Sequence, residues 1–348
     1  MTYVRNAWYV AGFEMDVEPG KPFAAMILNE PIVFFRAGDG RIVALEDRCV
    51  HRLAPLSLGR CEGDHIRCMY HGLMFDADGR CVEIPGQELI PAKARVRTYP
   101  VVVKHSWIWV WMGDPALADL GLVPPAIGYD DPAWVVGHGH LDYEADARLI
   151  ADNLLDFSHV TFVHADSFQM SPEYAYLPPR VTQLDRGVRI ERWTENTMGS
   201  TMVPAGEAVD HYVTYDFLVP GIDLLWSGYF PQGTARAVDY GRPDLSKGFG
   251  LSHQSHAGMP LGDRKARYYF LSAAGKAEGA EEACKMGIDI LRLVLEEDKK
   301  IIEGQQRIMD LTPDIRVMPT VHDLAIGYYD RAIARLLKEE KQSTEAAA

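Results

Sequence analysis

The chain has 348 residues, enough for about two domains of ordinary size. Because 47% of the residues are hydrophobic and 24% are charged, the composition is that of a globular protein and excludes extensive disorder and collagen-like repeats. The formal net charge is -14, from 35 basic and 49 acidic residues, and this acidic excess disfavours nucleic acid as a partner because it repels phosphate.

Membrane and disulfide-stabilised proteins are also disfavoured. No apolar run reaches the ~18 residues that a spanning helix needs, and residues 1–12 lack the pattern of a secretory signal, so we expect a cytoplasmic protein with no membrane contact. The cysteines, at positions 49, 61, 68, 81 and 284, are odd in number. In a large chain without a secretory signal, such cysteines are more often metal ligands or buried side chains than disulfide partners.

The first part of the chain, from residue 23 to residue 112, has the pattern of a small antiparallel β domain. Short apolar runs flank glycine-containing turns at residues 38–40 and 76–79, which is typical of β-hairpins. Two further runs are rich in aromatic and β-branched residues. The strands expected here lie at residues 32–35, 42–45, 81–84, 99–103 and 107–111.

Residues 114–133 mark a boundary, because their prolines, glycines and aspartates interrupt both helices and strands. Beyond it, residues 145–157 have apolar side chains at steps of one, three and four, which predicts a helix with one buried face. This face is formed by Leu149, Ile150, Leu154 and Phe157. The remaining elements expected are strands at residues 187–194, 211–219, 222–230 and 266–272 and helices at residues 280–310 and 333–340.

These patterns together predict the α+β fold class. An N-terminal all-β domain is expected over residues 1–116, followed by a linker over residues 117–133. The second domain, over residues 134–348, is expected to have a central antiparallel sheet with flanking helices.

Two loops of the β domain each carry one cysteine and one histidine: Cys49 and His51 in the first, Cys68 and His71 in the second. Four such ligands fit either a structural zinc ion or an iron–sulfur cluster with cysteines on one iron and histidines on the other. Zinc modules of this composition usually bring their cysteines as one pair and their histidines as another. Mixed loops therefore favour two metals, and ordinary buried side chains are the remaining alternative.

A second candidate metal site begins in the helix expected at residues 145–157. Asn153, Asp156, His159 and His164 form the pattern N-x2-D-x2-H-x4-H. The first three lie on one side of the helix while it lasts, and His164 can join His159 at one metal if the chain then turns. Two histidines and one carboxylate form the facial triad of non-haem iron(II) oxygenases. The carboxylate must come from elsewhere in the chain, and a solvated polar face is the alternative interpretation.

The residues around the first site resemble the Rieske domain of ring-hydroxylating and demethylating oxygenases. Here C-x-H is followed by R-L-A-P-L-S at residues 52–57, and C-x2-H lies within Y-H-G at residues 70–72. The pattern N-x2-D-x2-H-x4-H resembles the mononuclear-iron motif of the same oxygenases. Within this family the chain is similar to the group of vanillate O-demethylase, dicamba demethylase and toluenesulfonate methyl-monooxygenase, through residues 4–11, 83–87 and 109–115.

The resemblance implies a [2Fe–2S] Rieske cluster in the first domain. Cys49 and Cys68 would bind its inner iron, and His51 and His71 its outer iron. Neutral imidazoles leave less negative charge on the cluster than four thiolates would, which raises its reduction potential. The cluster would therefore accept electrons from a ferredoxin or a flavoprotein. The other cysteines match no ligand position.

The resemblance also implies a mononuclear Fe(II) in the second domain, with His159 and His164 as ligands. Asn153 would lie close to this iron. Asp156 would link the iron site to a Rieske histidine of a neighbouring subunit. The family's third ligand is an aspartate in an acidic and basic cluster that follows an apolar helical stretch, which matches Asp298.

Glu297 is the reserve for this third ligand, because it stands in the same charged run, residues 296–300. If Asp298 faces inward, Leu291, Val294 and Ile301 flank it at helical steps of three and four, and they would line the same wall of the site. A charge run on a helix can also be a solvated face.

A substrate contact is expected at His256, which roughly matches a substrate-contacting histidine of the dicamba enzyme. His253 lies three residues earlier and, in a strand, would point to the opposite face. A core or surface histidine is the alternative for both. The region between residues 170 and 285, where the substrate should bind, resembles the family only weakly, so the resemblance does not identify the substrate.

The resemblance implies the oxygenase component of a multicomponent Rieske monooxygenase. It would use O2 to hydroxylate the methoxy or methyl group of a small aromatic acid, as in O-demethylation of a vanillate-like substrate with release of formaldehyde. Electrons would come from NAD(P)H through a separate reductase with a flavin or ferredoxin centre, since the chain lacks a Gly-rich phosphate loop of its own. A head-to-tail homotrimer would join His71 of one subunit to Asp156 of the next.

Three other functions compete with this interpretation. A ring-dihydroxylating dioxygenase would use the same metal groups on a different carbon of the substrate. A Rieske electron carrier would need only the first site, and the second motif argues against it because a carrier needs no iron with open coordination positions. A zinc-stabilised binding protein would use the first site as a structural centre.

Overall fold

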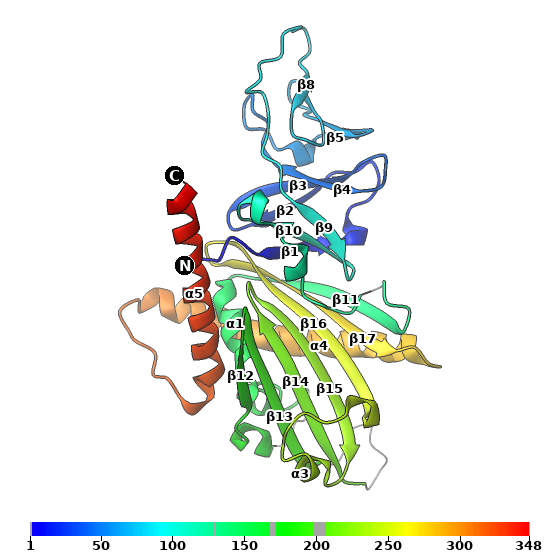
Figure 1. The fold of residues 1–348 in the computed structure, drawn as a ribbon, viewed down its shortest axis with the longest axis vertical. Helices are drawn as coiled ribbons and strands as arrows, with labels where there is room; N and C mark the ends of the chain where they lie inside the picture. Colours follow the sequence, from blue (N-terminus) through cyan, green and yellow to red (C-terminus); the bar gives the residue numbers. More distant parts are fainter. Residues whose placement is uncertain (1, 129, 168–171, 198–206, 348) are drawn as a thin grey trace. The chain divides into compact units, whose positions relative to one another are not determined.

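The computed structural model describes residues 2–128, 130–167, 172–197 and 207–347, which Figure 1 shows as a ribbon. They form two compact units. The smaller unit comprises Arg5–Val123 with Pro260–Asp263, and the larger comprises Pro124–Met259 and Arg264–Ala348 with the N-terminal residues up to Val4. The division after Val123 falls inside the expected linker, and the domain limits at residues 116 and 134 stay predictions.

The smaller unit consists of three sheets of antiparallel strand pairs. The two expected glycine turns connect consecutive strands, and Gly40 and Gly79 adopt the positive φ angles, 88° and 75°, that such turns need. The first sheet has the order β1 (Trp8–Phe13), β10 (Trp107–Trp111), β9 (Val101–Lys104); the second β2 (Phe23–Ile27), β3 (Glu30–Arg36), β4 (Ile42–Glu46); and the third β5 (Arg60–Glu62), β6 (His65–Arg67), β7 (Met74–Phe75), β8 (Cys81–Glu83).

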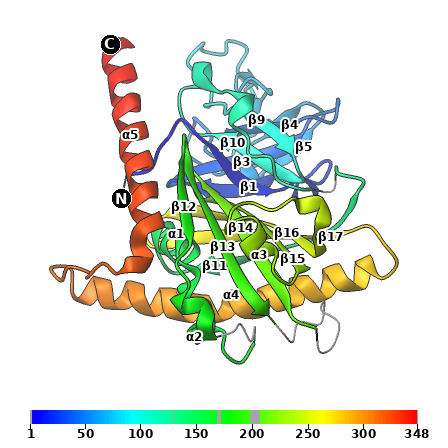
Figure 2. The same cartoon turned by 60° about the horizontal axis from the view of Figure 1, so that its bottom comes forward.

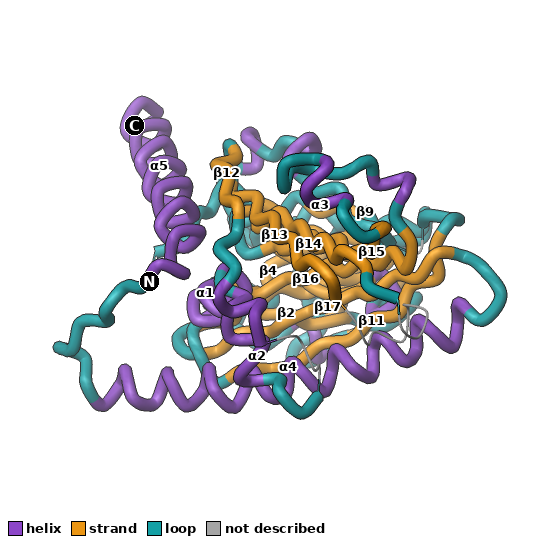
Figure 3. Tube along the Cα trace, turned by 90° about the horizontal axis from the view of Figure 1, so that it is seen from below, coloured by secondary structure: helices purple, strands orange, loops and turns teal. Residues whose placement is uncertain are grey.

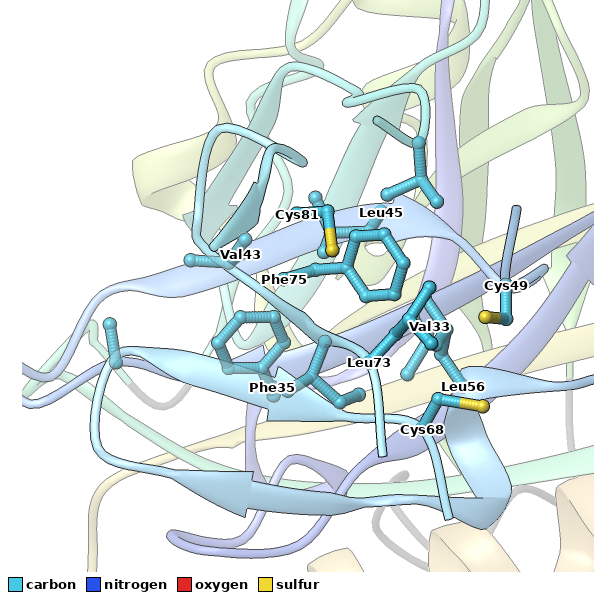
Figure 4. Packing of buried hydrophobic residues seen from close by; sticks show 13 residues of the cluster. Val33, Phe35, Val43, Leu45, Cys49, Leu56, Cys68, Leu73, Phe75 and Cys81 are labelled. Atoms are coloured by element: carbon cyan, nitrogen blue, oxygen red, sulfur yellow. The ribbon is translucent and has the colours of Figure 1, made fainter. Parts of the chain in front are cut away.

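A hydrophobic cluster in this unit joins strands of the second and third sheets (Figure 4). Apolar side chains of β3 and β4 pack with Phe75 of β7, which is fully buried. Cys49 and Cys68 lie at one edge of the cluster, whereas Cys81 lies beside Phe75, away from that pair. The core therefore anchors both loops that carry the expected cluster ligands.

The larger unit is built on one seven-stranded antiparallel sheet. Helix α4 (Ala280–Leu311) runs along one side of the sheet, across β11 and β17, and the short α3 (Thr234–Ala237) lies on the other side (Figures 2 and 3). The strand order is β11 (Trp134–Tyr143), β17 (Lys265–Gly275), β16 (Phe249–Gly262), β15 (Ile222–Pro231), β14 (Val209–Leu218), β13 (Gly187–Thr197), β12 (Arg180–Leu184), and the other helices are α1 (Ala147–Leu155), α2 (Val160–Val163) and α5 (Leu324–Ala347).

Helix α1 carries the first part of the second metal motif. The Asp146 carboxylate caps its first turn by accepting from the backbone N–H two residues later, at 2.9 Å. The helix ends at Leu155, because Asp156 has extended dihedral angles (φ -129°, ψ 94°). The helix predicted over residues 145–157 is therefore too long at both ends. Three of its four predicted core residues are buried, but Phe157 lies beyond the helix.

Helix α4 confirms the helix predicted at residues 280–310 and shows which side faces inward. Its buried residues include Leu291, Leu295, Asp298 and Ile302, at steps of four, three and four. Asp298 therefore faces inward. The expectation that Ile301 lines the same wall is wrong, because Ile301 is 56% exposed and Ile302 takes the inward position.

The predicted α+β class, with an all-β region followed by an antiparallel sheet and helices, is confirmed. The sequence predictions missed β11, β12 and β16 in the larger unit, and β1, β2, β5 and β6 in the smaller unit. Strand β16 is rich in glycine, serine and histidine, residues that do not form an apolar strand pattern, so only its sheet neighbours reveal it. The C-terminal helix is longer than the predicted 333–340. Within the described residues, no helix combines the length and apolar character needed to cross a membrane.

Candidate metal centres

The two Cys/His loops of the smaller unit have matching backbone hydrogen bonds. In each loop the cysteine N–H donates to the carbonyl five residues later, at 2.9 Å from Cys49 and 2.8 Å from Cys68. Each cysteine carbonyl accepts from the N–H four residues later, at 2.9 Å in both loops. That fourth residue has positive φ in both loops: Leu53 at 59° and Gly72 at 79°. The chain thus makes the same turn twice, and the cysteines occupy equivalent positions.

The four expected cluster ligands come together at these loops. The rings of His51 and His71 lie 4.5 Å apart between centroids. Cys49 and Cys68 are each 1% exposed. Burial, together with the adjacent Cys68 sulfur, raises the pKa of the Cys49 thiol to about 11. Because a positive metal centre is what stabilises such buried thiolates, two buried sulfurs beside two exposed imidazoles fit an iron–sulfur cluster with one buried and one exposed iron.

Arg67, which belongs to no recognised sequence motif, holds the second loop in place. Its Nη1 donates to the Gly72 carbonyl at 2.8 Å, and its guanidinium also pairs with Glu62 and Glu83 at 2.8–3.1 Å. Its side chain is only 15% exposed. The only sequence signal was that neighbouring short strands carry Glu62, Arg67 and Glu83. In sequence, such residues cannot be distinguished from those of an ordinary surface ion pair.

The second group of expected ligands also comes together, in the larger unit. His159 ends the 3-10 turn Phe157–His159, His164 follows α2, and Asp298 lies on the inward side of α4. Their ligand atoms all lie within 4.8 Å of one another. Asp298 Oδ1 is 3.5 Å from Nε2 of His159 and 3.3 Å from Nε2 of His164. Residues 139 positions apart in sequence thus supply one small cluster of nitrogen and oxygen donors.

The other nitrogen of each histidine is already engaged. Nδ1 of His159 lies 2.6 Å from the Asp156 carbonyl oxygen, which can only accept, so Nδ1 carries the proton. Nδ1 of His164 lies 2.7 Å from Glu297 Oε2, which also accepts from the Ser167 hydroxyl at 2.7 Å. Both Nε2 atoms are therefore free to bind a metal, as is typical of metal-binding histidines.

The two candidate carboxylate ligands, Asp298 and Glu297, contact different nitrogens of His164. Asp298 groups with the histidine Nε2 atoms, whereas Glu297 contacts the far nitrogen of His164. Burial alone would lower the pKa of His164, but the Asp298 and Glu297 carboxylates outweigh it and raise that pKa above its usual value. The same two carboxylates favour any positive charge at this point, so the donors and the local charge both fit a divalent iron ion.

Asn153 and Asp156 flank the cluster. The Asn153 side-chain amide donates to Asp298 Oδ1 at 3.2 Å, and its Nδ2 is 3.4 Å from Nε2 of His159. The Asp156 carboxylate accepts from the Ser158 N–H at 2.9 Å and so caps the 3-10 turn that carries His159. Asp156 thus positions His159 through both its carbonyl and its side chain.

His256 lies on β16, directly opposite Asp223 of β15. Its Nε2 is 3.2 Å from Gln254 Oε1, and burial lowers the pKa of His256 to about 3, so the ring is neutral. His253 pairs with Trp226, three positions along, and therefore points to the other face of the sheet, as expected. A substrate contact for His256 stays a prediction.

Comparison with known proteins finds two matching families. Residues 7–100 match the Rieske [2Fe-2S] domain, and residues 143–339 match the vanillate O-demethylase oxygenase C-terminal domain. The chain is 35% identical to the toluene-4-sulfonate monooxygenase system iron-sulfur subunit of Comamonas testosteroni, covering 98% of this chain and 99% of that one. It is 31% identical to a vanillate O-demethylase oxygenase subunit of a Pseudomonas species, covering 99% and 98%.

Among solved structures, those of dicamba monooxygenase have a similar fold. The chain is similar to dicamba monooxygenase bound to 3,6-dichlorosalicylic acid, with a TM-score of 0.85, 29% identity and 99% of both chains covered. It is also similar to dicamba monooxygenase with non-heme iron and dicamba, with a TM-score of 0.74 and 27% identity over 99% of this chain and 100% of that one.

Proposed function

Because the chain belongs to the Rieske non-haem iron oxygenases related to vanillate O-demethylase, we propose that it is the oxygenase component of a multicomponent monooxygenase that acts on small aromatic acids. The observation that carries the proposal is that one chain has both constellations: two equivalent Cys/His loops in the smaller unit and the cluster of His159, His164 and Asp298 in the larger. Neither an electron carrier nor a zinc-stabilised binding protein would need a second metal site made of His159, His164 and Asp298.

The residues of the two constellations divide between two metal groups. Cys49, Cys68, His51 and His71 would hold the [2Fe–2S] cluster, with the buried thiolates on one iron and the exposed imidazoles on the other. The donors within 4.8 Å of one another in the larger unit would hold a mononuclear Fe(II). When bound, the cluster supplies electrons and the mononuclear iron supplies dioxygen activation.

The chain's own residues prepare the iron site. The Asp156 carbonyl and the Glu297 carboxylate hold the imidazole protons on Nδ1, so that His159 and His164 present Nε2 to the ion. The Asn153 amide donates to Asp298 and limits rotation of that carboxylate. These contacts fix the ligand geometry before the ion binds, which lowers the entropy lost on binding.

The proposed substrate is a small aromatic acid that bears a methoxy or methyl group. The relatives named for vanillate, toluene-4-sulfonate and dicamba support this class. Hydroxylation of a methoxy carbon, with one oxygen atom of O2 inserted into a C–H bond and the other reduced to water, gives a hemiacetal. The hemiacetal then loses formaldehyde and leaves a phenol.

The proposed partners are a separate reductase with a flavin or ferredoxin centre, which takes electrons from NAD(P)H, and two further copies of this chain. In the proposed head-to-tail homotrimer, electrons pass from His71 of one subunit to Asp156 of the next. Apolar side chains are exposed next to the cluster histidines: Leu53 is 64% exposed, Met69 54% and Tyr70 59%. Such exposed apolar side chains support a protein-binding surface at this place.

A product screen tests the proposed reaction. The purified protein, a generic reductase and NADH are incubated with vanillate, syringate, methoxybenzoates and toluenesulfonate, and with naphthalene and biphenyl as ring-hydroxylation substrates. We expect formaldehyde from a methoxy acid or a benzylic alcohol from a methyl arene. A cis-dihydrodiol as the main product contradicts the monooxygenase assignment and supports ring dihydroxylation instead.

A further inference from the structure

Three buried polar side chains on neighbouring strands have atoms without a hydrogen-bond partner among the described residues. They are both carboxylate oxygens of Asp223 on β15, Nδ1 of His256 on β16 and the hydroxyl of Tyr268 on β17. Asp223 is 0%, His256 4% and Tyr268 1% exposed. Buried polar groups in folded proteins are almost always hydrogen-bonded, so three unpartnered groups together indicate a site for a polar group of a ligand.

The three side chains are contiguous on one face of the sheet. Asp223 and His256 are directly opposite each other in the β15–β16 register, and such pairs lie side by side on the same face. The His256 ring lies 5.6 Å from the Tyr268 ring between centroids. A single small group can therefore contact atoms from all three strands.

This group of three polar side chains lies next to the turn of α4 that carries Asp298. The Tyr268 ring is 6.2 Å from that of Tyr143, and the Tyr143 hydroxyl donates to the Leu295 carbonyl at 3.0 Å. Leu295 and Asp298 are one helical turn apart on the inward side of α4. Asp298 is also near enough to Tyr268 to act on it electrostatically, so a ligand that contacts Tyr268 is close to the proposed iron ligands.

The chemistry of the three groups restricts what they can bind. Since Nε2 of His256 donates to Gln254, Nδ1 of this neutral ring is a bare acceptor. Burial raises the pKa of Asp223 well above its usual value, which favours the protonated carboxyl, a hydrogen-bond donor. The Tyr268 hydroxyl can donate or accept. The buried cation Arg192 is on the same side of the sheet, but it lies opposite Val213, Ser227 and Ser252, four residues farther along the strands than Asp223 and His256.

We propose that Asp223, together with His256 and Tyr268, binds a neutral substrate group that both donates and accepts hydrogen bonds, namely a phenolic hydroxyl on the aromatic ring. The hydroxyl accepts from the Asp223 carboxyl and donates to Nδ1 of His256. A carboxylate only accepts and would leave Nδ1 unsatisfied. Asp223 is then a specificity-determining residue of the iron site, and this inference rests on the proposed function.

Binding of two acids that differ by one hydroxyl tests the proposal. Calorimetry on the iron-loaded protein compares vanillate with 3-methoxybenzoate. We expect the wild type to bind vanillate at least about tenfold more tightly, because a site built for a hydroxyl rejects the analogue that lacks it. Asp223→Leu should abolish this preference and leave the affinity for 3-methoxybenzoate nearly unchanged, whereas Asp223→Asn, which keeps a donor, should retain part of it.

Asp216→Leu is the matched control. Asp216 lies on the neighbouring strand β14 and pairs with Arg189 at 2.6 Å, with its register position facing away from Asp223. This variant should keep the wild-type preference. If Asp223→Leu does not fold, as judged from the cluster absorbance, Tyr268→Phe and Asp223→Asn measure the same preference.

Equal affinity of the wild type for the two acids, or a preference that survives Asp223→Leu, overturns the assignment of the hydroxyl site. Formaldehyde release tests the proposed function separately. If vanillate binds with the expected preference but no methoxy acid yields formaldehyde, the reaction is wrong and the hydroxyl site stands.

Discussion

At the proposed iron site, some residues would bind the ion directly, and others hold the side chains that bind it. The sequence predicted both histidines, because metal ligands must be particular residue types at short, fixed spacings. It favoured Asp298 over Glu297 only through the family resemblance, since adjacent residues on a helix point about 100° apart and the helical pattern alone lets either face inward. The structure separates them: the Asp298 side chain is 7% exposed and faces both Nε2 atoms, and Glu297 contacts Nδ1 of His164.

Replacing Glu297 therefore weakens iron binding without removing a ligand. In Glu297→Ala, Nδ1 of His164 loses its acceptor, and we expect the affinity of the mononuclear site for iron to fall about 10–100-fold. Glu297→Gln keeps an acceptor oxygen and should lose less. Iron retained during dialysis against graded chelator concentrations measures the effect. Glu296→Ala, one residue earlier on the same helix, is the control, and equal iron loss in Glu296→Ala and Glu297→Ala contradicts the assigned role.

Among the structural elements, the paired Cys/His loops show what sequence motifs leave out. The motifs identify the four ligands but not the equivalent turns, because the positive φ of Leu53 cannot be predicted from a residue that rarely adopts it. Gly72 holds the corresponding position in the second loop. A Cβ there would lie 2.8 Å from Cγ of Pro85, a ring that cannot rotate away. The second loop thus depends on glycine for both its dihedral angles and its contact.

Gly72→Ala should consequently destabilise the cluster-binding loops more than Gly86→Ala. Both glycines have positive φ, 79° and 77°, so each substitution costs roughly 1–2 kcal/mol of backbone strain. Only Gly72→Ala adds a clash, because nothing lies within 4 Å of a Cβ at Gly86. The visible absorbance of the cluster during thermal unfolding reports the difference. A Gly72→Ala protein as stable as Gly86→Ala would show that the Pro85 contact is unimportant.

In the whole molecule, the sequence predicted the class of each region and the motif residues, but not the contacts made by distant strands. Apolar periodicity revealed β13, β14, β15 and α4. Strand β16 has no such periodicity, and Asp223 matches no motif, so their pairing became evident only in the assembled sheet. The expected metal ligands could be named from sequence motifs, and His256 from the family resemblance, whereas Asp223 and Tyr268 could not be singled out.

The proposed electron path between subunits predicts a specific defect in Asp156→Asn. Asparagine caps a helical turn as well as aspartate does, so His159 should stay in place and both metal groups should stay bound. The link to the neighbouring cluster histidine loses its carboxylate, and we expect oxidation of the reduced cluster by O2 in the presence of substrate to slow by about tenfold or more. Stopped-flow absorbance measures this single turnover. Asp152→Asn, in the last turn of helix α1 before Asp156, is the control, and an unchanged rate in Asp156→Asn excludes the path.

Metal and sulfide analysis of the purified protein and of His164→Ala is the most direct test of the assignment of two metal groups to one chain. We expect about three irons and about two acid-labile sulfides per wild-type chain, and the loss of about one iron in His164→Ala with the cluster spectrum and sulfide content unchanged. A wild-type protein with zinc and no sulfide, or a His164→Ala protein with the wild-type iron content, would contradict the assignment.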